Sequence, residues 1–129
     1  MSINKIIKEL DYKKIMKEIL KTIYDALDDK KANNIVILDI SEISEITDYF
    51  VICSGSNQNQ VQAISDNVEE ELAKKDIKGK KIEGFKNAEW ILMDYSDFVI
   101  HIFSDEQREF YGLEKIWSDA KRVEVYTSK

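Results

Sequence analysis

The first apolar residues of the chain recur at a helical spacing. Between residues 12 and 29 they lie three and four positions apart, with lysines and acids between them, and they comprise Tyr12, Ile15, Met16, Ile19, Leu20, Ile23 and Leu27. That spacing places the set on one face of an amphipathic helix. Residues 3–10 either extend this helix or form a separate turn, and the pattern leaves both open.

Continuous apolar runs then replace the helical spacing. Residues 34–40 (NIVILDI) and 48–54 (DYFVICS) are short apolar runs, and the segment SEISEIT separates them. Unbroken runs of this kind indicate strands that are covered on both faces. A second helix is predicted from about Gln58 to Lys75, because its apolar residues return to the helical spacing at Val61, Ile64, Val68 and Leu72.

The second half of the chain predicts further strands. The loop over residues 76–87 contains a short strand at 80–83. EWILMD (89–94) and FVIHIF (98–103) are two strands about three residues apart, which is typical of a hairpin.

A short helical segment closes the fold. Ser104 or Asp105 can cap a helix that Gly112 interrupts, and a second turn carries Ile116 and Trp117. Strand–helix alternation followed by a hairpin predicts an α/β fold, with a mixed β-sheet flanked by helices.

Length and composition indicate one domain. A chain of 129 residues with 43% apolar residues can bury a sizeable core. We place the domain at residues 13–120, with an N-terminal extension over 1–12 and a C-terminal tail over 121–129. A single cysteine fits a reducing compartment, and neither a membrane span nor a signal peptide is recognisable in the sequence. We therefore expect a soluble cytoplasmic protein that has no contact with a membrane.

Charge is unevenly distributed along the chain. Between residues 82 and 119 there are nine acids and three bases, so this segment accounts for the whole net charge of −6. An acidic half attracts basic partners and repels phosphate. Little direct contact with nucleic acid is expected, since such binding depends on lysine and arginine.

Two motifs invite an enzymatic interpretation that their spacing does not support. SGSNQNQ lacks the lysine of a P-loop and the further glycines of a dinucleotide loop, so we expect Gly55 to turn the chain and Ser56 or Asn57 to cap the helix. Asp94 and Asp97 are three residues apart, whereas two metal-binding carboxylates on one side of a strand need an even spacing. A turn-forming role is favoured for both aspartates.

His101 and Cys53 also favour structural roles. His101 lies in the middle of a strand with no neighbouring cysteine or second histidine, so we expect a hydrogen-bonded histidine in the sheet rather than a metal ligand. Cys53 ends a buried strand and acts as a small apolar filler. We expect no catalytic residue, no metal and no cofactor.

Trp90 allows two interpretations. Ile91 and Met93 face one side of their strand while Trp90 and Leu92 face the other. The tryptophan either completes the core or, with Tyr95 at the hairpin tip, forms a contact surface ringed by acids for a basic partner.

Three segments together resemble a known family. TDYFVICSGSNQNQVQAISDNVEEEL, EGFKNAEWILMDYSDFVIHIF and REFYGLEKIW occur in this order, and the chain from about residue 14 to residue 119 closely resembles the ribosomal silencing factors, also called Iojap-related proteins.

The resemblance implies a function and a topology. Family members are translation repressors without enzymatic activity. They bind the large ribosomal subunit through its fourteenth ribosomal protein, which lies where the small subunit joins, and so block subunit association when nutrients are scarce. The implied fold has a nucleotidyltransferase-like topology without a catalytic site. The alternatives are a metal-dependent nucleotidyltransferase-like enzyme or nucleotide-binding protein, and a scaffold that forms a homodimer when free.

The resemblance also implies which residues bind the partner. The family's contact strand corresponds to Trp90, Ile91, Leu92, Asp94 and Tyr95, and its final helical motif carries Arg108, Glu109, Tyr111 and Lys115. One position departs from the family pattern, because Ser96 stands in the hairpin where glycine is typical. If the backbone there has a positive φ, serine strains the turn by about 1 kcal/mol.

Overall fold

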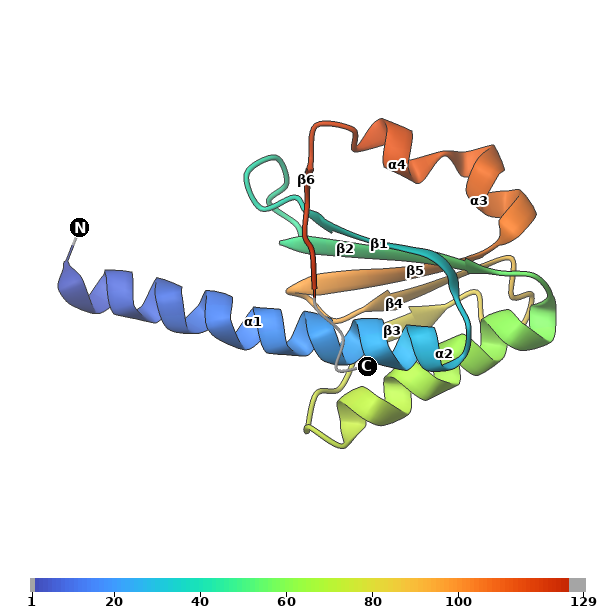
Figure 1. Ribbon diagram of the computed structural model, residues 1–129, viewed down its shortest axis with the longest axis horizontal. Coiled ribbons are helices and arrows are strands. Elements are labelled where there is room, and N and C mark those ends of the chain that lie inside the picture. The colour runs from blue at the N-terminus through green and yellow to red at the C-terminus, as the bar shows by residue number, and fades with distance from the viewer. Residues whose placement is uncertain (1, 126–129) are drawn as a thin grey trace.

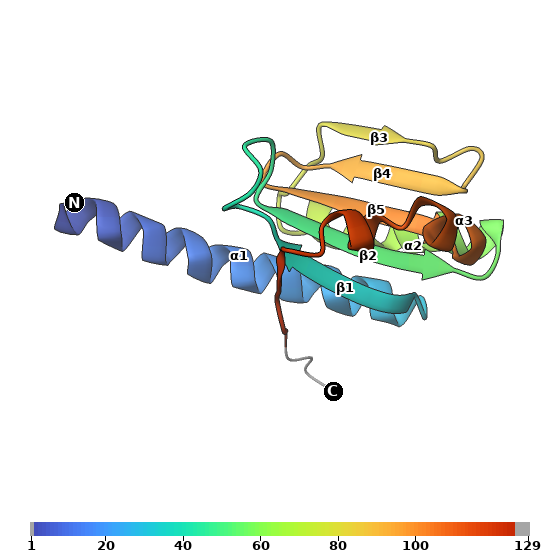
Figure 2. The same cartoon turned by 90° about the horizontal axis from the view of Figure 1, so that it is seen from above.

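The computed structural model describes residues 2–125 and contains one mixed sheet between two layers of helices (Figures 1 and 2). The six strands are ordered β3-β4-β5-β2-β1-β6. The elements are α1 (Ile3–Asp29), β1 (Asn33–Asp39), β2 (Tyr49–Gly55), α2 (Gln58–Ala73), β3 (Lys81–Glu83), β4 (Trp90–Asp94), β5 (Phe98–Ser104), α3 (Asp105–Tyr111), α4 (Leu113–Ile116) and β6 (Lys121–Arg122). The predicted α/β class with a mixed sheet and flanking helices is confirmed.

Helix α1 is longer than the range over which the apolar spacing predicted a helix. Ser2 caps it by accepting a hydrogen bond from the Lys5 N–H, and the helix continues without a break to Asp29. Residues 3–10 therefore extend the helix. Its first turns project beyond the sheet (Figure 1). Ile15, expected on the buried face, is 55% exposed, whereas its neighbour Met16 is 2% exposed.

The sheet is built around a parallel pair of strands. β2 runs parallel to β5, with Ile52 opposite His101, and every other neighbouring pair is antiparallel. In the β4–β5 hairpin Leu92 lies opposite His101. Helices cover both faces of the central strands, which explains their unbroken apolar sequences.

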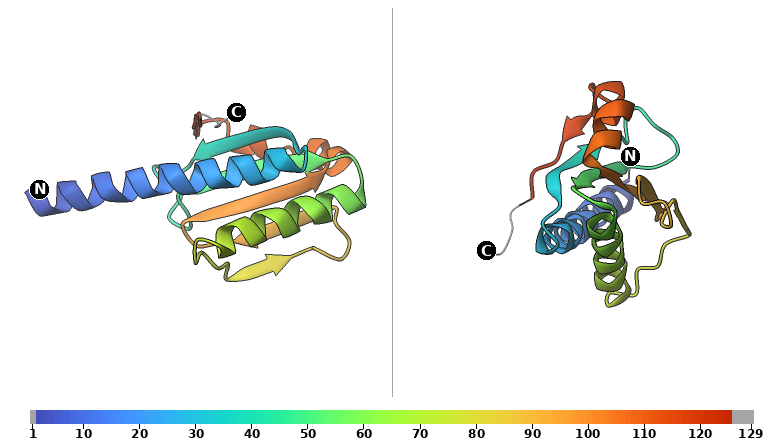
Figure 3. Two further views of the ribbon diagram at one scale, coloured as in Figure 1. Left: turned by 60° about the horizontal axis from the view of Figure 1, so that its bottom comes forward. Right: turned by 90° about the vertical axis from the view of Figure 1, so that its right-hand side faces the viewer.

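The two faces of the sheet carry cores of different size. Helices α1 and α2 lie side by side on one face (Figure 3), where the predicted stripe of α2 is fully buried: Val61, Ile64, Val68 and Leu72. The opposite face lies under α3 and α4, and its buried cluster is smaller: Leu38, Ile40, Ile52 and Phe103. A thinner cover on this face leaves part of the sheet accessible.

The C-terminal segment does not begin as a free tail. Strand β6 pairs with β1, with Arg122 opposite Leu38, and the Val123 N–H donates to the Ile37 carbonyl at 2.9 Å. The first residues of the expected C-terminal tail are therefore attached to the edge of the sheet. Residues 126–129 of the expected tail lie outside the described residues.

Candidate docking surface

The hairpin of β4 and β5 separates the expected contact residues by face. Trp90, Leu92 and Asp94 are partly exposed and alternate with Ile91 and Met93, which are fully buried. Alternation along a strand sends the first three side chains to one face and the other two into the core. Ile91 was expected to contact a partner, but its buried side chain supports the strand from behind.

Trp90 packs within a group of aromatic rings on the α3 side of the sheet. Its ring centroid lies 4.9 Å from that of Phe103 and 4.8 Å from that of Tyr111. Tyr111 is 45% exposed, so the cluster reaches from the core to the surface. Trp90 therefore packs on the smaller core, and part of its side chain remains exposed.

His101 holds the indole of Trp90 from the neighbouring strand. The Trp90 Nε1–H donates to His101 Nδ1 at 3.1 Å, and the Phe50 ring lies edge-to-face with the imidazole at 4.6 Å between centroids. Only 3% of His101 is exposed, and burial lowers the pKa of its imidazole to about 4. The expectation of a hydrogen-bonded histidine in the sheet is confirmed.

The tip of the β4–β5 hairpin is held by Asp94 and by the inward packing of Tyr95. The Asp94 carboxylate accepts a hydrogen bond from the Ser96 N–H at 2.9 Å, which confirms the turn-forming role of Asp94. Ser96 has a φ of 70°, the positive value at which serine strains the turn. Tyr95 is only 8% exposed and stacks on Phe98 at 4.8 Å. Tyr95 was expected on the contact surface, but packing against the larger core turns its ring inward.

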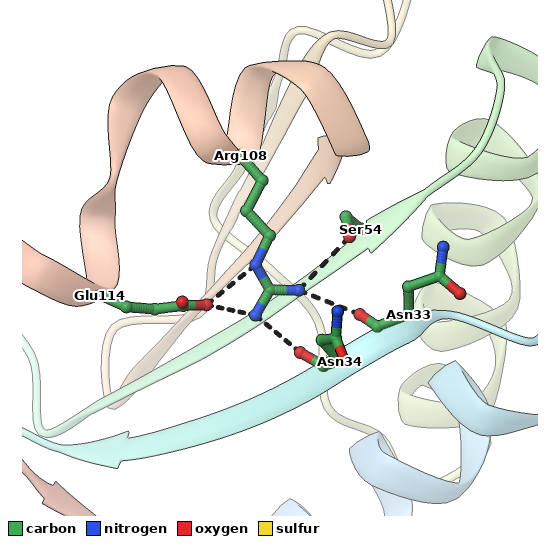
Figure 4. Close-up of polar contacts among 5 residues, drawn as sticks. All are labelled: Asn33, Asn34, Ser54, Arg108 and Glu114. Atoms are coloured by element: carbon green, nitrogen blue, oxygen red, sulfur yellow. Dashed lines mark hydrogen bonds and ion pairs between the residues drawn. The ribbon is translucent and has the colours of Figure 1, made fainter.

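Arg108 connects α3 to the sheet (Figure 4). Its guanidinium donates to the backbone carbonyls of Asn33 at 3.0 Å and Asn34 at 2.7 Å, and to the Ser54 hydroxyl at 3.3 Å. The Glu114 carboxylate accepts from Nε at 2.9 Å and also from Nη2, the nitrogen that donates to Asn34. With 12% of the side chain exposed, the guanidinium is occupied by these intramolecular bonds and has little surface to offer a partner.

The other expected residues of the helical motif are accessible. Glu109, Tyr111 and Lys115 all lie on the surface of α3 and α4. Exposed apolar side chains that the sequence reasoning did not single out lie on these helices and on the loop between β1 and β2: Ile43, Ile46, Phe110 and Ile116. Figure 1 shows that loop rising on the same side of the sheet as α3 and α4. The sequence signal for Ile43 and Ile46 was their position as isolated apolar residues within the polar segment SEISEIT.

The remaining motifs have structural roles. Asn57 caps α2 by accepting a hydrogen bond from the Gln60 N–H at 2.9 Å, as predicted for Ser56 or Asn57. Cys53 is buried, and burial raises the pKa of its thiol to about 12.

Within residues 2–125, no group of three or more metal-binding side chains is assembled. No helix in this range has the length and apolar character needed to cross a membrane.

Sequence comparisons identify similar proteins. The profile of a family described as ribosomal silencing factor during starvation matches residues 13–129. A ribosomal silencing factor from Bacillus subtilis is 45% identical over 109 residues, which cover 84% of this chain and 92% of that protein. The chloroplastic protein Iojap of Arabidopsis thaliana is 35% identical over 98 residues, or 75% of this chain and 40% of that protein.

Solved structures share the same fold. A crystal structure from Bacillus halodurans has a TM-score of 0.74 at 39% identity, covering 84% of this chain and 98% of that one. A second crystal structure, from Chromobacterium violaceum, has a TM-score of 0.77 at 28% identity, covering 87% of this chain and 94% of that one.

Proposed function

The chain belongs to the ribosomal silencing factor family, and on that basis we propose that it represses translation by binding the large ribosomal subunit. The family resemblance inferred from the three sequence segments is confirmed. In our proposal the chain binds the fourteenth protein of the large subunit, and its presence there blocks the approach of the small subunit. The repression is steric, and the chain catalyses no reaction.

The observation that carries this proposal is the partly covered aromatic face of the sheet. Trp90 and Leu92 are partly exposed, and Tyr111 is exposed beside them. Aromatic residues in the middle of a surface are the side chains that most often dominate protein–protein affinity. We define the docking surface as Trp90, Leu92, Asp94, Glu109 and Tyr111, with Lys115 at its edge.

The charge of the surrounding segments supports a basic partner. Acids with accessible side chains lie on β3, on the loop before β4 and on α3: Glu83, Glu89, Asp105, Glu106 and Glu109. Ribosomal proteins are commonly basic, so opposite charges would meet across the interface and favour encounter in the correct orientation. A standard interface takes roughly 800 Å² from each partner, an area that a domain of this size can provide.

Co-sedimentation with purified large ribosomal subunits tests the proposal. Trp90→Ala should abolish binding, because the variant loses the largest exposed ring of the surface. Asp94→Asn keeps an oxygen for the Ser96 N–H and removes only the charge, so it should weaken binding by about two- to five-fold. Asp66→Asn is the matched control, since it makes the same change at an exposed position of α2 on the opposite face.

Two results would contradict the proposal. The assignment of the docking surface would be contradicted if Trp90→Ala is folded, as judged by circular dichroism, and still co-sediments with large subunits. The steric mechanism would be contradicted if the wild-type protein binds large subunits but does not change how they join with small subunits. Nucleotide binding that requires magnesium and Asp94, measured by titration calorimetry, would favour the nucleotidyltransferase-like alternative.

A further inference from the structure

We propose that His101 is a positioning residue for partner binding, which holds the indole of Trp90 in the orientation that the docking surface requires. This inference rests on the proposed function, because it assigns to a buried residue a role that acts through Trp90. His101 itself is 3% exposed and touches no partner directly.

The register of the hairpin brings the two side chains together. Trp90 lies opposite Phe103, and Leu92 lies opposite His101, so Trp90 and His101 are diagonal neighbours on one face of the sheet. Diagonal neighbours are within reach of large side chains. The Trp90 Nε1–H uses this proximity to donate to His101 Nδ1 at 3.1 Å.

The hydrogen bond fixes the protonation state of the imidazole. Nδ1 accepts a hydrogen only when it carries none, so the single proton of the neutral ring is on Nε2. Nε2 is buried and has no hydrogen-bond partner among residues 2–125, and burial lowers the pKa of the ring to about 4. At neutral pH the imidazole is therefore an acceptor for the indole.

The surrounding rings restrict the remaining motion of Trp90. Phe103 and Tyr111 pack on the indole at 4.9 and 4.8 Å between centroids, while His101 provides the only hydrogen bond of the indole among residues 2–125. Ring packing alone allows the indole to turn over, since its two edges are similarly apolar apart from the N–H. The hydrogen bond selects one orientation, and a side chain ordered before binding loses less entropy when the partner arrives.

His101 should contribute to the affinity for the large subunit and not only to the stability of the fold. Holding one large side chain in its bound orientation corresponds to about a three- to ten-fold change in Kd. His101→Leu removes the acceptor and keeps an apolar side chain suited to the core. His101→Asn restores an acceptor oxygen close to the position of Nδ1 and should recover part of the affinity.

A double-mutant cycle with Trp90→Phe separates positioning from packing. Phenylalanine has no N–H to donate, so His101→Leu should weaken binding to purified large subunits three- to ten-fold in the Trp90 background and have no effect in the Trp90→Phe background. An equal loss in both backgrounds would show that His101 acts on the fold, and it would overturn the inference. His101→Met serves as a second apolar variant if His101→Leu does not fold.

Nuclear magnetic resonance of the free protein provides a test that is independent of the ribosome. The Trp90 indole N–H, identified with the help of Trp117→Phe, should exchange faster and shift toward the free-indole position in His101→Leu and not in His101→Asn. An unchanged resonance would overturn the inference even if the proposed function holds. The expected resonance change together with unaltered binding by Trp90→Ala would instead show that the hydrogen bond exists but that Trp90 is not part of the docking surface, and it would overturn the role of His101 in binding along with that surface.

Discussion

Ser96 turns the β4–β5 hairpin with a backbone conformation that favours glycine. Its φ of 70° lies in the left-handed region, where the Cβ of an L-residue crowds the following carbonyl. The turn is kept by the Asp94 carboxylate, which accepts the Ser96 N–H at 2.9 Å, and by the Asp97 N–H, which donates to the Tyr95 carbonyl at 2.9 Å. These bonds hold the tip in place against the local strain.

Glycine at this position should stabilise the protein. Removing the Cβ relieves about 1–2 kcal/mol of strain, while the greater freedom of glycine in the unfolded chain offsets about 0.5–1 kcal/mol of it. Ser96→Gly should therefore raise the free energy of unfolding in urea by about 0.5–1 kcal/mol. Ser96→Ala keeps the Cβ and should give no gain, so equal stability of the two variants would contradict the strain.

At the level of elements, α3 and α4 depend on their attachment to the sheet. They contain seven and four residues, too few to form stable helices alone. Gly112 ends α3 in the left-handed conformation and redirects the chain into α4. Arg108 bonds backward to Asn33 and Asn34 and forward to Glu114, so one guanidinium fixes both helices on the sheet.

Lysine cannot replace Arg108 in this role, because a single ammonium group lacks the planar fork that reaches all these acceptors. Arg108→Lys should lower the free energy of unfolding by about 1–3 kcal/mol, and hydrogen exchange should quicken in α3 and α4 before it does in α2. Lys115→Ala, at an exposed position on α4, should change the unfolding free energy by less than about 0.5 kcal/mol. Uniform loss of protection across the whole sheet would contradict a local attachment.

The elements differ in how far the sequence predicted them. Local patterns were sufficient for α2, for the hairpin and for the Asn57 cap, because spacing and capping involve residues close in the chain. The inward position of Tyr95 and the bonds of Arg108 depend on residues distant in sequence. The burial expected for Ile15 was wrong, because the helical spacing gives the apolar face of α1 but not how much of that face the sheet and α2 cover.

At the scale of the whole molecule, the segment between residues 82 and 119 carries the net negative charge of the chain. Its acids lie on β3, β4, α3, α4 and the loops next to them, so their field extends from the docking surface. Fields of this kind mainly accelerate encounter, and salt screens them beyond about 10 Å at 0.1 M.

The association rate with the proposed basic partner should therefore depend on salt. We expect the rate constant, measured by stopped-flow fluorescence, to fall at least about ten-fold between low and high ionic strength, with little change in dissociation. Glu106→Gln with Glu109→Gln should reduce the low-salt rate more than Glu69→Gln with Glu70→Gln, which makes the same charge change on α2. Equal effects of the two pairs would contradict steering by the α3 side.

The parallel pairing of β2 with β5 also orders events during synthesis of the chain. Helix α1, strands β1 and β2 and helix α2 leave the ribosomal exit tunnel before β5, which must then insert between β2 and β4. The indole, the imidazole beneath it and the helix beside it all come from the last third of the polypeptide. A nascent chain therefore lacks the means to silence ribosomes until its translation is almost finished.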